Sequence, residues 1–179
     1  MAVSTATPKG QVVIPAELRR KYQIEAGTKV SVADGDGTLR AGFVRDSHAL
    51  LAYFEGEAGG ALVRRLIQDA EQRRVRLYLS LINWGEVFYI VRREKGDVAA
   101  HEVVARLDVL PITLRGVDRQ LVQAAATLKA AHPIAYADAF AAATANRLNI
   151  PVVTGDPEFH RLEPETKVVW TSGPLAADG

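Results

Sequence analysis

Four acidic residues stand where the chain passes from one expected element to the next, and together they have the chemistry of a metal site. They are Asp46, Glu86, Asp138 and Asp156. Carboxylates that converge repel one another, and their pKa values rise unless a cation neutralises them. The chain has no cysteine and no obvious histidine pair, so the expected ligands are all oxygen atoms, which suit Mg²⁺ or Mn²⁺. Such an ion can activate water for in-line displacement at a phosphodiester.

Each acidic residue also has an ordinary structural explanation. Asp46 precedes an apolar helical pattern and has the type of an N-cap. Asn83 and Glu86 have the spacing of a capping box. The helix dipole favours Asp138 in a first turn, and Asp156 follows a glycine, as turn residues do. Caps and turns explain each position taken alone, whereas the combination favours a shared site.

The elements that must position these residues alternate between strands and helices. Strands are expected at 43–45, 75–81, 109–114, 151–154 and 167–170, and helices at 49–54, 61–74, 84–95, 98–107, 118–131 and 136–149. This alternation predicts an α/β fold with a parallel sheet. Functional side chains of such sheets gather outside the carboxyl ends of the strands. Asp46 and Asp156 directly follow expected strands, and Glu86 follows one by a short turn.

Composition limits the classes of protein that remain. The chain has 179 residues, 48% of them hydrophobic, and a formal net charge of +1, which fits one ordinary domain with a small appendage. The lack of cysteine excludes disulfides, thiolate zinc sites and a cysteine nucleophile. No signal peptide is recognisable, and no apolar run approaches the roughly 18 residues of a membrane span. A soluble cytoplasmic protein with no membrane partner is expected.

Residues 1–40 have the pattern of a separate module. They carry six Lys/Arg and four Asp/Glu, against 16 and 17 in the remainder. A strand is expected at 11–14, a helix at 16–22 with Pro15 at its start, and a turn at 34–37. A unit this small rarely buries a sufficient core alone, so a homodimer is expected. The predicted domains are 1–40 and 41–172, followed by a disordered tail at 173–179.

The segment 8–20, followed by 27–30, resembles the AbrB/MazE-type swapped-hairpin DNA-binding domain. The resemblance implies two interlaced copies in a β-rich dimer that binds operator DNA. Lys9, Gln11, Arg19 and Arg20 match its DNA-contacting positions. Basic side chains there would neutralise phosphates, and the glutamine would reach a base edge. For an isolated basic triplet at 19–21 a solvated helix face is the better explanation; the surrounding motif reverses that preference.

Four further segments, 44–52, 83–87, 136–142 and 154–159, resemble the acidic motifs of PIN domains, closest to VapC-type toxins. The resemblance implies a PIN-like (Rossmann-like) parallel sheet flanked by helices, and a Mg²⁺- or Mn²⁺-dependent ribonuclease that acts on RNA. The four acidic residues are then metal ligands. Ser47 and Thr154 match positions whose hydroxyls support the site.

Two positions near Asp46 need comment. Arg45 departs from the family pattern, which usually has an apolar residue there. It is expected either to pair with a neighbouring acid or to mark a strand that starts late and is exposed. For His48, a surface or helix role is favoured over a place at the rim of the site.

Two functions from different classes follow. The first is an endoribonuclease of toxin–antitoxin type fused to a DNA-binding head, with a separate antitoxin chain as a further possible partner. The second is a non-catalytic transcriptional regulator or antitoxin-like protein whose α/β domain binds other proteins. A head too short to dimerise is a third possibility.

Residues 38–44 are required by both modules. The head needs them as a return strand, and the nuclease needs 43–45 to present Asp46. The nuclease has the larger core, so its sheet is predicted to take the chain from Gly42 onward. The head's last strand is then limited to 38–40, and its dimer is weakened.

Overall fold

A computed structural model describes residues 14–21, 24, 41–57 and 60–171. The chain separates into two units, residues 1–28 with 173–179, and residues 29–172. In the first unit, helix α1 spans Ala16–Lys21, as expected. The predicted strand at 11–14, apart from its last residue, the turn at 34–37 and the tail lie outside the described residues. The domain boundaries therefore stay predictions.

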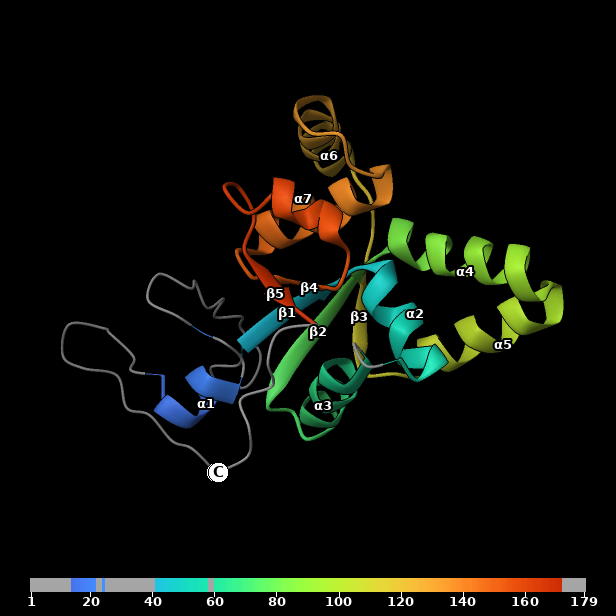
Figure 1. Ribbon diagram of the computed structural model, residues 1–179, viewed down its shortest axis with the longest axis horizontal. Coiled ribbons are helices and arrows are strands. Elements are labelled where there is room, and N and C mark those ends of the chain that lie inside the picture. The colour runs from blue at the N-terminus through green and yellow to red at the C-terminus, as the bar shows by residue number, and fades with distance from the viewer. Residues whose placement is uncertain (1–13, 22–23, 25–40, 58–59, 172–179) are drawn as a thin grey trace. The chain divides into compact units, whose positions relative to one another are not determined.

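The second unit is built on a five-stranded parallel sheet (Figure 1). Its strands are β1 (Ala41–Arg45), β2 (Val75–Ser80), β3 (Ile112–Arg115), β4 (Val152–Thr154) and β5 (Val168–Trp170). Their order is β3-β2-β1-β4-β5, and every pairing is parallel, which confirms the predicted fold class. The chain builds outward from β1 in one direction and then returns to its other side with β4. The crevice between β1 and β4 is the topological switch point, where open α/β sheets bind ligands.

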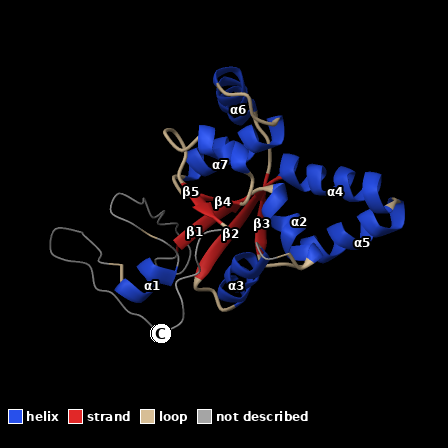
Figure 2. Cartoon of the chain, viewed as in Figure 1, coloured by secondary structure: helices blue, strands red, loops and turns tan. Residues whose placement is uncertain are grey.

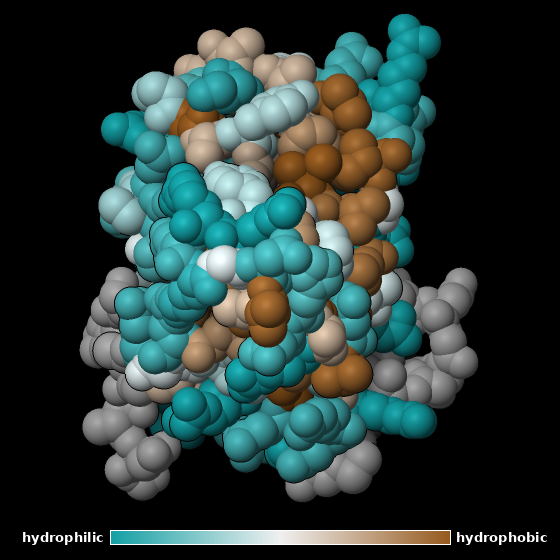
Figure 3. Space-filling view, turned by 90° about the vertical axis from the view of Figure 1, so that its right-hand side faces the viewer, coloured by the Kyte–Doolittle hydropathy of each residue, from teal (hydrophilic) through white to brown (hydrophobic). Residues whose placement is uncertain are grey.

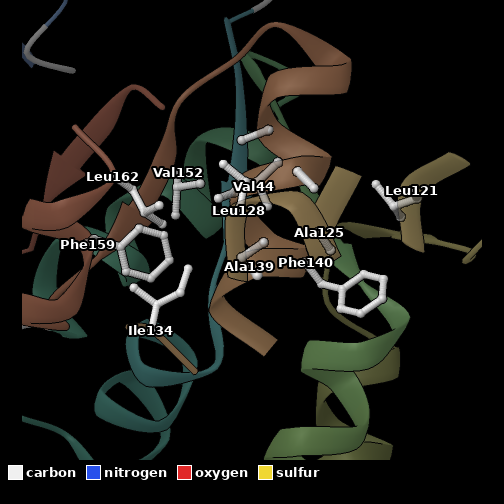
Figure 4. Close-up of a cluster of buried hydrophobic side chains, with 14 of the residues drawn as sticks. Val44, Leu121, Ala125, Leu128, Ile134, Ala139, Phe140, Val152, Phe159 and Leu162 are labelled. Atoms are coloured by element: carbon white, nitrogen blue, oxygen red, sulfur yellow. The ribbon is translucent and has the colours of Figure 1, made fainter. Parts of the chain in front are cut away.

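Helices cover both faces of this sheet (Figure 2). They are α2 (Ser47–Glu55), α3 (Gly60–Glu71), α4 (Leu81–Lys95), α5 (Asp97–Asp108), α6 (Arg119–Ala131) and α7 (Tyr136–Leu148), with a 3₁₀ turn η1 (Pro157–Arg161). Val44 packs with α6, α7 and η1 in one buried cluster (Figure 4). Leu79 packs with α2, α4 and α5 in another. Burial of these apolar surfaces is the main source of stability.

Strand β1 belongs to the larger unit. Phe43 pairs with Leu77 of β2, and Val44 lies between Tyr78 of β2 and Val152 of β4. The prediction that the nuclease sheet takes the chain from Gly42 onward is confirmed. The shortened strand predicted for the head at 38–40 lies outside the described residues.

Three elements differ from the predictions by three residues or more. Helix α3, expected to end at 74, ends at Glu71. Strand β3 starts at Ile112 instead of 109, because Pro111 cannot donate a ladder hydrogen bond; it lies at the sheet edge, as expected. Helix α4 starts at Leu81, directly after β2, and Ser80 is its N-cap. Asn83 therefore lies inside the helix, and its predicted capping role is wrong.

The described surface includes several exposed large hydrophobic residues, among them Val98 and Val109. Figure 3 shows a mostly polar face with hydrophobic residues gathered in a band along one side. Within the described part of the chain, no helix combines the length and apolar character required to cross a membrane.

Candidate active site

Asp46 follows β1 at the switch point and is completely buried. Its Oδ1 accepts a hydrogen bond from the backbone N–H of Ala49 at 2.8 Å, so it caps α2. Its Oδ2 accepts a hydrogen bond from the hydroxyl of Thr154. Burial raises the pKa of Asp46 to about 6, although both hydrogen bonds favour the charged form and oppose the rise. Asp46 therefore caps α2 with one oxygen, and this is compatible with a place in the predicted site.

Glu86 is tied to the start of α2 through Ser47. The Ser47 hydroxyl donates to Oε2 of Glu86 at 2.6 Å, and Asn83 Nδ2 donates to Ser47 Oγ at 3.2 Å. Asn83 also donates to the carbonyl of Ala137 at 3.1 Å, which joins α4 to the first turn of α7. The hydroxyl of Tyr89 donates to Oε1 of Glu86 at 3.3 Å. Glu86 is thus held by hydroxyl groups from two helices.

Asp138 lies in the first turn of α7, as predicted, and is only 6% exposed. No described residue donates a hydrogen bond to its carboxylate. Its pKa rises to about 8, first because burial penalises the charged form and then because of the negative charges of Asp46, Asp156, Glu86 and Glu158. The four predicted acids therefore share one region of negative potential.

Asp156 and Glu158 form the turn after β4. The Asp156 backbone N–H donates to Thr154 Oγ1 at 2.9 Å, and Asp156 Oδ1 accepts from the Glu158 N–H at 2.8 Å. Glu158 Oε2 accepts from the N–H of Ala135 at 2.8 Å, the N-cap position of α7. Glu158 was not predicted as a site residue. The only feature of the sequence that could have indicated Glu158 is its position two residues after Asp156.

An all-oxygen donor set fits a hard divalent cation chemically. One observation supports the fit: Asn83 Oδ1 is buried without a hydrogen-bond donor. The acidic side chains are not arranged as a closed ligand shell, because among the described residues no three His, Asp or Glu side chains stand close enough together to hold a metal ion. Binding would therefore require rotamer changes, which the carboxylates of Asp138 and Asp156 can make most easily because neither is clamped on both oxygens.

A family model named PIN domain matches residues 43–164, about two thirds of the chain. The chain belongs to the PIN domain family. Members of this family generally use divalent metal ions. A second model, the antidote-toxin recognition domain of the bacterial antitoxin MazE, matches residues 3–40. The predicted combination of a PIN domain with a MazE-like N-terminal module is therefore confirmed.

Solved structures share the fold of this PIN domain. A VapBC2 structure from Rickettsia felis, bound to a promoter DNA fragment, has a chain with 15% identity and a TM-score of 0.58; the alignment covers 72% of this chain and 98% of that one. DNA-bound VapBC from Salmonella typhimurium has a chain with 18% identity and a TM-score of 0.58, and the alignment covers 75% of this chain and 99% of that one. The sarcin-ricin loop cleaving toxin VapC20 of Mycobacterium tuberculosis has 19% identity and a TM-score of 0.53, and the alignment covers 66% of this chain and 93% of that one. No curated protein sequence matches the chain. At these identities the likeness establishes the fold.

Arg45 of the PIN domain is completely buried at the end of β1. The alternative of a late, exposed strand is therefore wrong, because β1 already starts at Ala41 and its last residue is covered. Nη2 donates to the carbonyl of Val63 at 3.4 Å, while Nε and Nη1 have no partner among the described residues. Burial lowers the pKa of Arg45 to about 9, and the charge of Asp46 opposes this.

His48 is exposed on α2 of the PIN domain, as expected for a surface or helix position, and its ring also lies next to the turn that carries Asp156. A Cβ placed on Gly155 would be 3.2 Å from Cε1 and Nδ1 of the His48 ring. The imidazole therefore covers the turn between Thr154 and Asp156. Its charge also contributes to lowering the pKa of Asp46, against the larger effect of burial.

The predicted DNA-binding residues lie in the other unit. Arg19 and Arg20 are exposed in the last turn of α1, where their charges are available to a polyanion. Lys9 and Gln11 lie outside the described residues.

Proposed function

We propose that this chain is a metal-dependent endoribonuclease of toxin–antitoxin type, fused to a DNA-binding head. The observation that carries the proposal is the burial of the Asp46 and Asp138 carboxylates, which are 0% and 6% exposed; the raised pKa of Asp138, caused first by burial and then by the charges of the other predicted ligands, supports it. The predicted ligands come from the end of β1, from α4, from α7 and from the turn after β4, and carboxylates whose charges influence one another are costly without a cation. Asp46, Glu86, Asp138 and Asp156 would hold Mg²⁺ or Mn²⁺.

The bound ion would supply an activated water and stabilise charge that develops on the phosphodiester. The chain's own residues orient the ligands. Thr154 fixes one oxygen of Asp46, and the backbone of α2 fixes the other. Ser47 fixes Glu86, and Asn83 keeps Ser47 in place relative to α7. These supporting contacts act on the ligands, as the surrounding hydrogen bonds of metal sites usually do.

The head supports a role in DNA binding. The MazE model matches residues 3–40, and Lys9, Gln11, Arg19 and Arg20 are the proposed contacts. Two relatives of the same fold were solved as VapBC complexes on DNA. We infer operator DNA and a cognate antitoxin as partners, with a homodimer formed through the head.

The test is cleavage of an RNA pool by the full chain in Mg²⁺ and in EDTA. Wild type should cleave in Mg²⁺ alone. Asp46→Asn and Asp138→Asn should lose the activity by at least about 100-fold, the scale of losses seen when groups supporting a metal centre are removed. Asp97→Asn is the matched control, because Asp97 is an exposed carboxylate on α5 that pairs with Arg92. Cleavage that persists in EDTA or in both variants would contradict the proposal.

The MazE match also favours a second candidate, a regulator that binds DNA without cleaving RNA. A salt-dependent shift of promoter DNA together with no cleavage of any RNA in Mg²⁺ or Mn²⁺ would select it.

A further inference from the structure

A cavity of about 120 Å³ lies beside the carboxyl end of β3, and its lining includes none of the four predicted metal ligands. We refer to it as the Arg115 pocket. It is lined by Leu114, Arg115, Gly116, Asp118, Leu121, Thr144, Arg147 and Leu148. The walls come from three places: the end of β3 with the turn that follows, the start of α6, and the last two turns of α7. Its polar lining is dominated by two guanidinium groups.

The hydroxyl of Thr144 in this pocket has no partner. Thr144 is 2% exposed, and its Oγ1 forms no hydrogen bond. A helical threonine commonly donates to the carbonyl one turn earlier, and Thr144 does not. Leaving a buried hydroxyl unsatisfied costs about 1–3 kcal/mol. Because the oxygen itself is buried, a ligand oxygen would supply the missing acceptor once the side chains that cover Thr144 move aside.

The charge of the pocket is positive. Arg147 Nη1 donates to Asp118 Oδ2 at 2.6 Å, and Asp118 Oδ1 accepts from the Leu121 N–H at 2.8 Å. The Asp118 carboxylate is therefore already satisfied on both oxygens. Arg115 is the excess cation: its guanidinium lies 5.9 Å from the centroid of the Tyr78 ring, and no described carboxylate forms an ion pair with it.

Two estimates from backbone geometry bear on the distance between the pocket and the acidic residues. Strand β3 is two strands from β1 in the sheet, and neighbouring strands are about 4.8 Å apart, which gives roughly 10 Å. Thr144 follows Asp138 by six residues on α7, a rise of about 9 Å along the helix. Both estimates give a backbone separation of roughly 10 Å.

We propose that the Arg115 pocket binds a phosphate of single-stranded RNA, one neighbouring the phosphate that is cleaved. The inference rests on the proposed ribonuclease function and extends it to a substrate-positioning site. Arg115 and Arg147 pair with the phosphate oxygens, a geometry that guanidinium groups favour. Thr144 donates its free hydroxyl to the same group. The pocket thereby anchors a chain that the negative acidic residues would otherwise repel.

The test measures binding of a labelled oligouridylate by fluorescence anisotropy at several salt concentrations. The full chain carries Asp138→Asn to prevent cleavage. Arg115→Gln should weaken binding about tenfold at low salt. It should also reduce the slope of log K against log salt by about 0.7, as expected for the loss of one phosphate contact on a single strand. Arg64→Gln is the matched control, since Arg64 is exposed on α3 and lines no part of the pocket.

The Thr144→Val variant tests whether RNA binding can weaken without a loss of folding stability. The variant keeps the side-chain shape and removes a hydroxyl that has no partner, so its melting temperature should stay the same or rise. Binding should weaken several-fold with the salt slope unchanged, because no charge is lost.

An Arg115→Gln variant with wild-type affinity and salt slope would overturn the pocket proposal. If wild type still cleaves RNA in that case, the proposed function stands. A wild-type chain that neither cleaves nor binds RNA would overturn both.

Discussion

The hydroxyl of Thr154 donates a hydrogen bond to Oδ2 of Asp46, which joins residues 108 positions apart in the sequence. The contact exists because β1 and β4 pair in parallel, with Arg45 opposite Val153. The same oxygen of Thr154 accepts from the backbone N–H of Asp156. One hydroxyl therefore couples the two acidic residues that follow the central strands.

Replacing Thr154 with valine should destabilise the chain and raise the pKa of Asp46. The variant leaves a buried carboxylate oxygen and the Asp156 N–H unsatisfied, at a cost of about 1–3 kcal/mol. Because the lost hydrogen bond lowers the pKa of Asp46 from an already raised value, the acidic limb of the pH–rate profile should move to higher pH. Urea unfolding and cleavage rates across pH measure the two effects, and Thr154→Ser, which keeps the donor, is the control. A valine variant with an unchanged profile would contradict the assigned role.

Asp46 and Asp138 should make a contribution to the stability of the metal-free chain that is lost as pH rises from 4 to 9. The carboxyl pKa of Asp46 is raised from 3.8 to about 6 and that of Asp138 from 3.8 to about 8. Between these limits the two groups in the folded state bind protons that they do not bind in the unfolded state, so their contribution is fully present below about 4 and is lost through 6 and 8.

Asp138→Asn should remove its share of this pH dependence. In EDTA at pH 9 the variant should melt several degrees above wild type, because about 1 kcal/mol moves the melting temperature of a domain this size by roughly 2–4 °C. At pH 4 the two should melt together. Addition of Mg²⁺ at pH 8 should stabilise wild type more than the variant. A difference in melting temperature between variant and wild type that stays the same from pH 4 to pH 9 would contradict the raised pKa of Asp138.

The sequence predicted the strands that carry Asp46 and Asp156, because short β-branched runs between helical patterns have few other interpretations. It failed for Asn83. The capping-box spacing was a local signal, whereas helix α4 begins at Leu81 without a connecting turn, and the partners of Asn83 are Ser47 and the Ala137 carbonyl. Such contacts between distant segments depend on how α4 and α7 meet, which no local pattern specifies.

The surroundings of Arg45 and Glu158 also depend on distant segments and could not be predicted from local sequence. The strand at Arg45 was predictable, but the charged residue in it suggested either a pair with a neighbouring acid or an exposed strand, and the structure buries it completely. Glu158 was ordinary in sequence and contacts the N-cap of α7 only because η1 returns toward that helix.

Arg45→Met should stabilise the fold. Two of the three guanidinium nitrogens are buried without partners, and burial lowers the Arg45 pKa to about 9. Replacing a poorly paired buried charge with an apolar side chain of similar length is commonly neutral or stabilising by about 1–4 kcal/mol. The urea midpoint measures the change, and Arg45→Lys, which retains a buried charge, should show no gain. A methionine variant that loses more than about 1 kcal/mol would mean that the guanidinium has a stabilising partner.

Gly60→Ala should destabilise the chain, because the start of α3 lies close to the backbone of α2 at this residue. An added Cβ would lie 2.7 Å from the carbonyl oxygen of Ala52 and 2.9 Å from Cα of Tyr53. Both atoms belong to the backbone of α2, so the helices must move apart, at a cost of roughly 1–3 kcal/mol. Urea unfolding of the full chain gives the change directly.

Gly85→Ala is the matched comparison for that measurement. Gly85 lies in α4, and an added Cβ would meet nothing within 4 Å. Alanine is favoured over glycine inside a helix by about 1 kcal/mol, so this variant should be more stable than wild type. The packing described requires that the free energy of unfolding decrease in Gly60→Ala and increase in Gly85→Ala. If both substitutions stabilise the chain, Gly60 cannot be in this close contact with the backbone of α2.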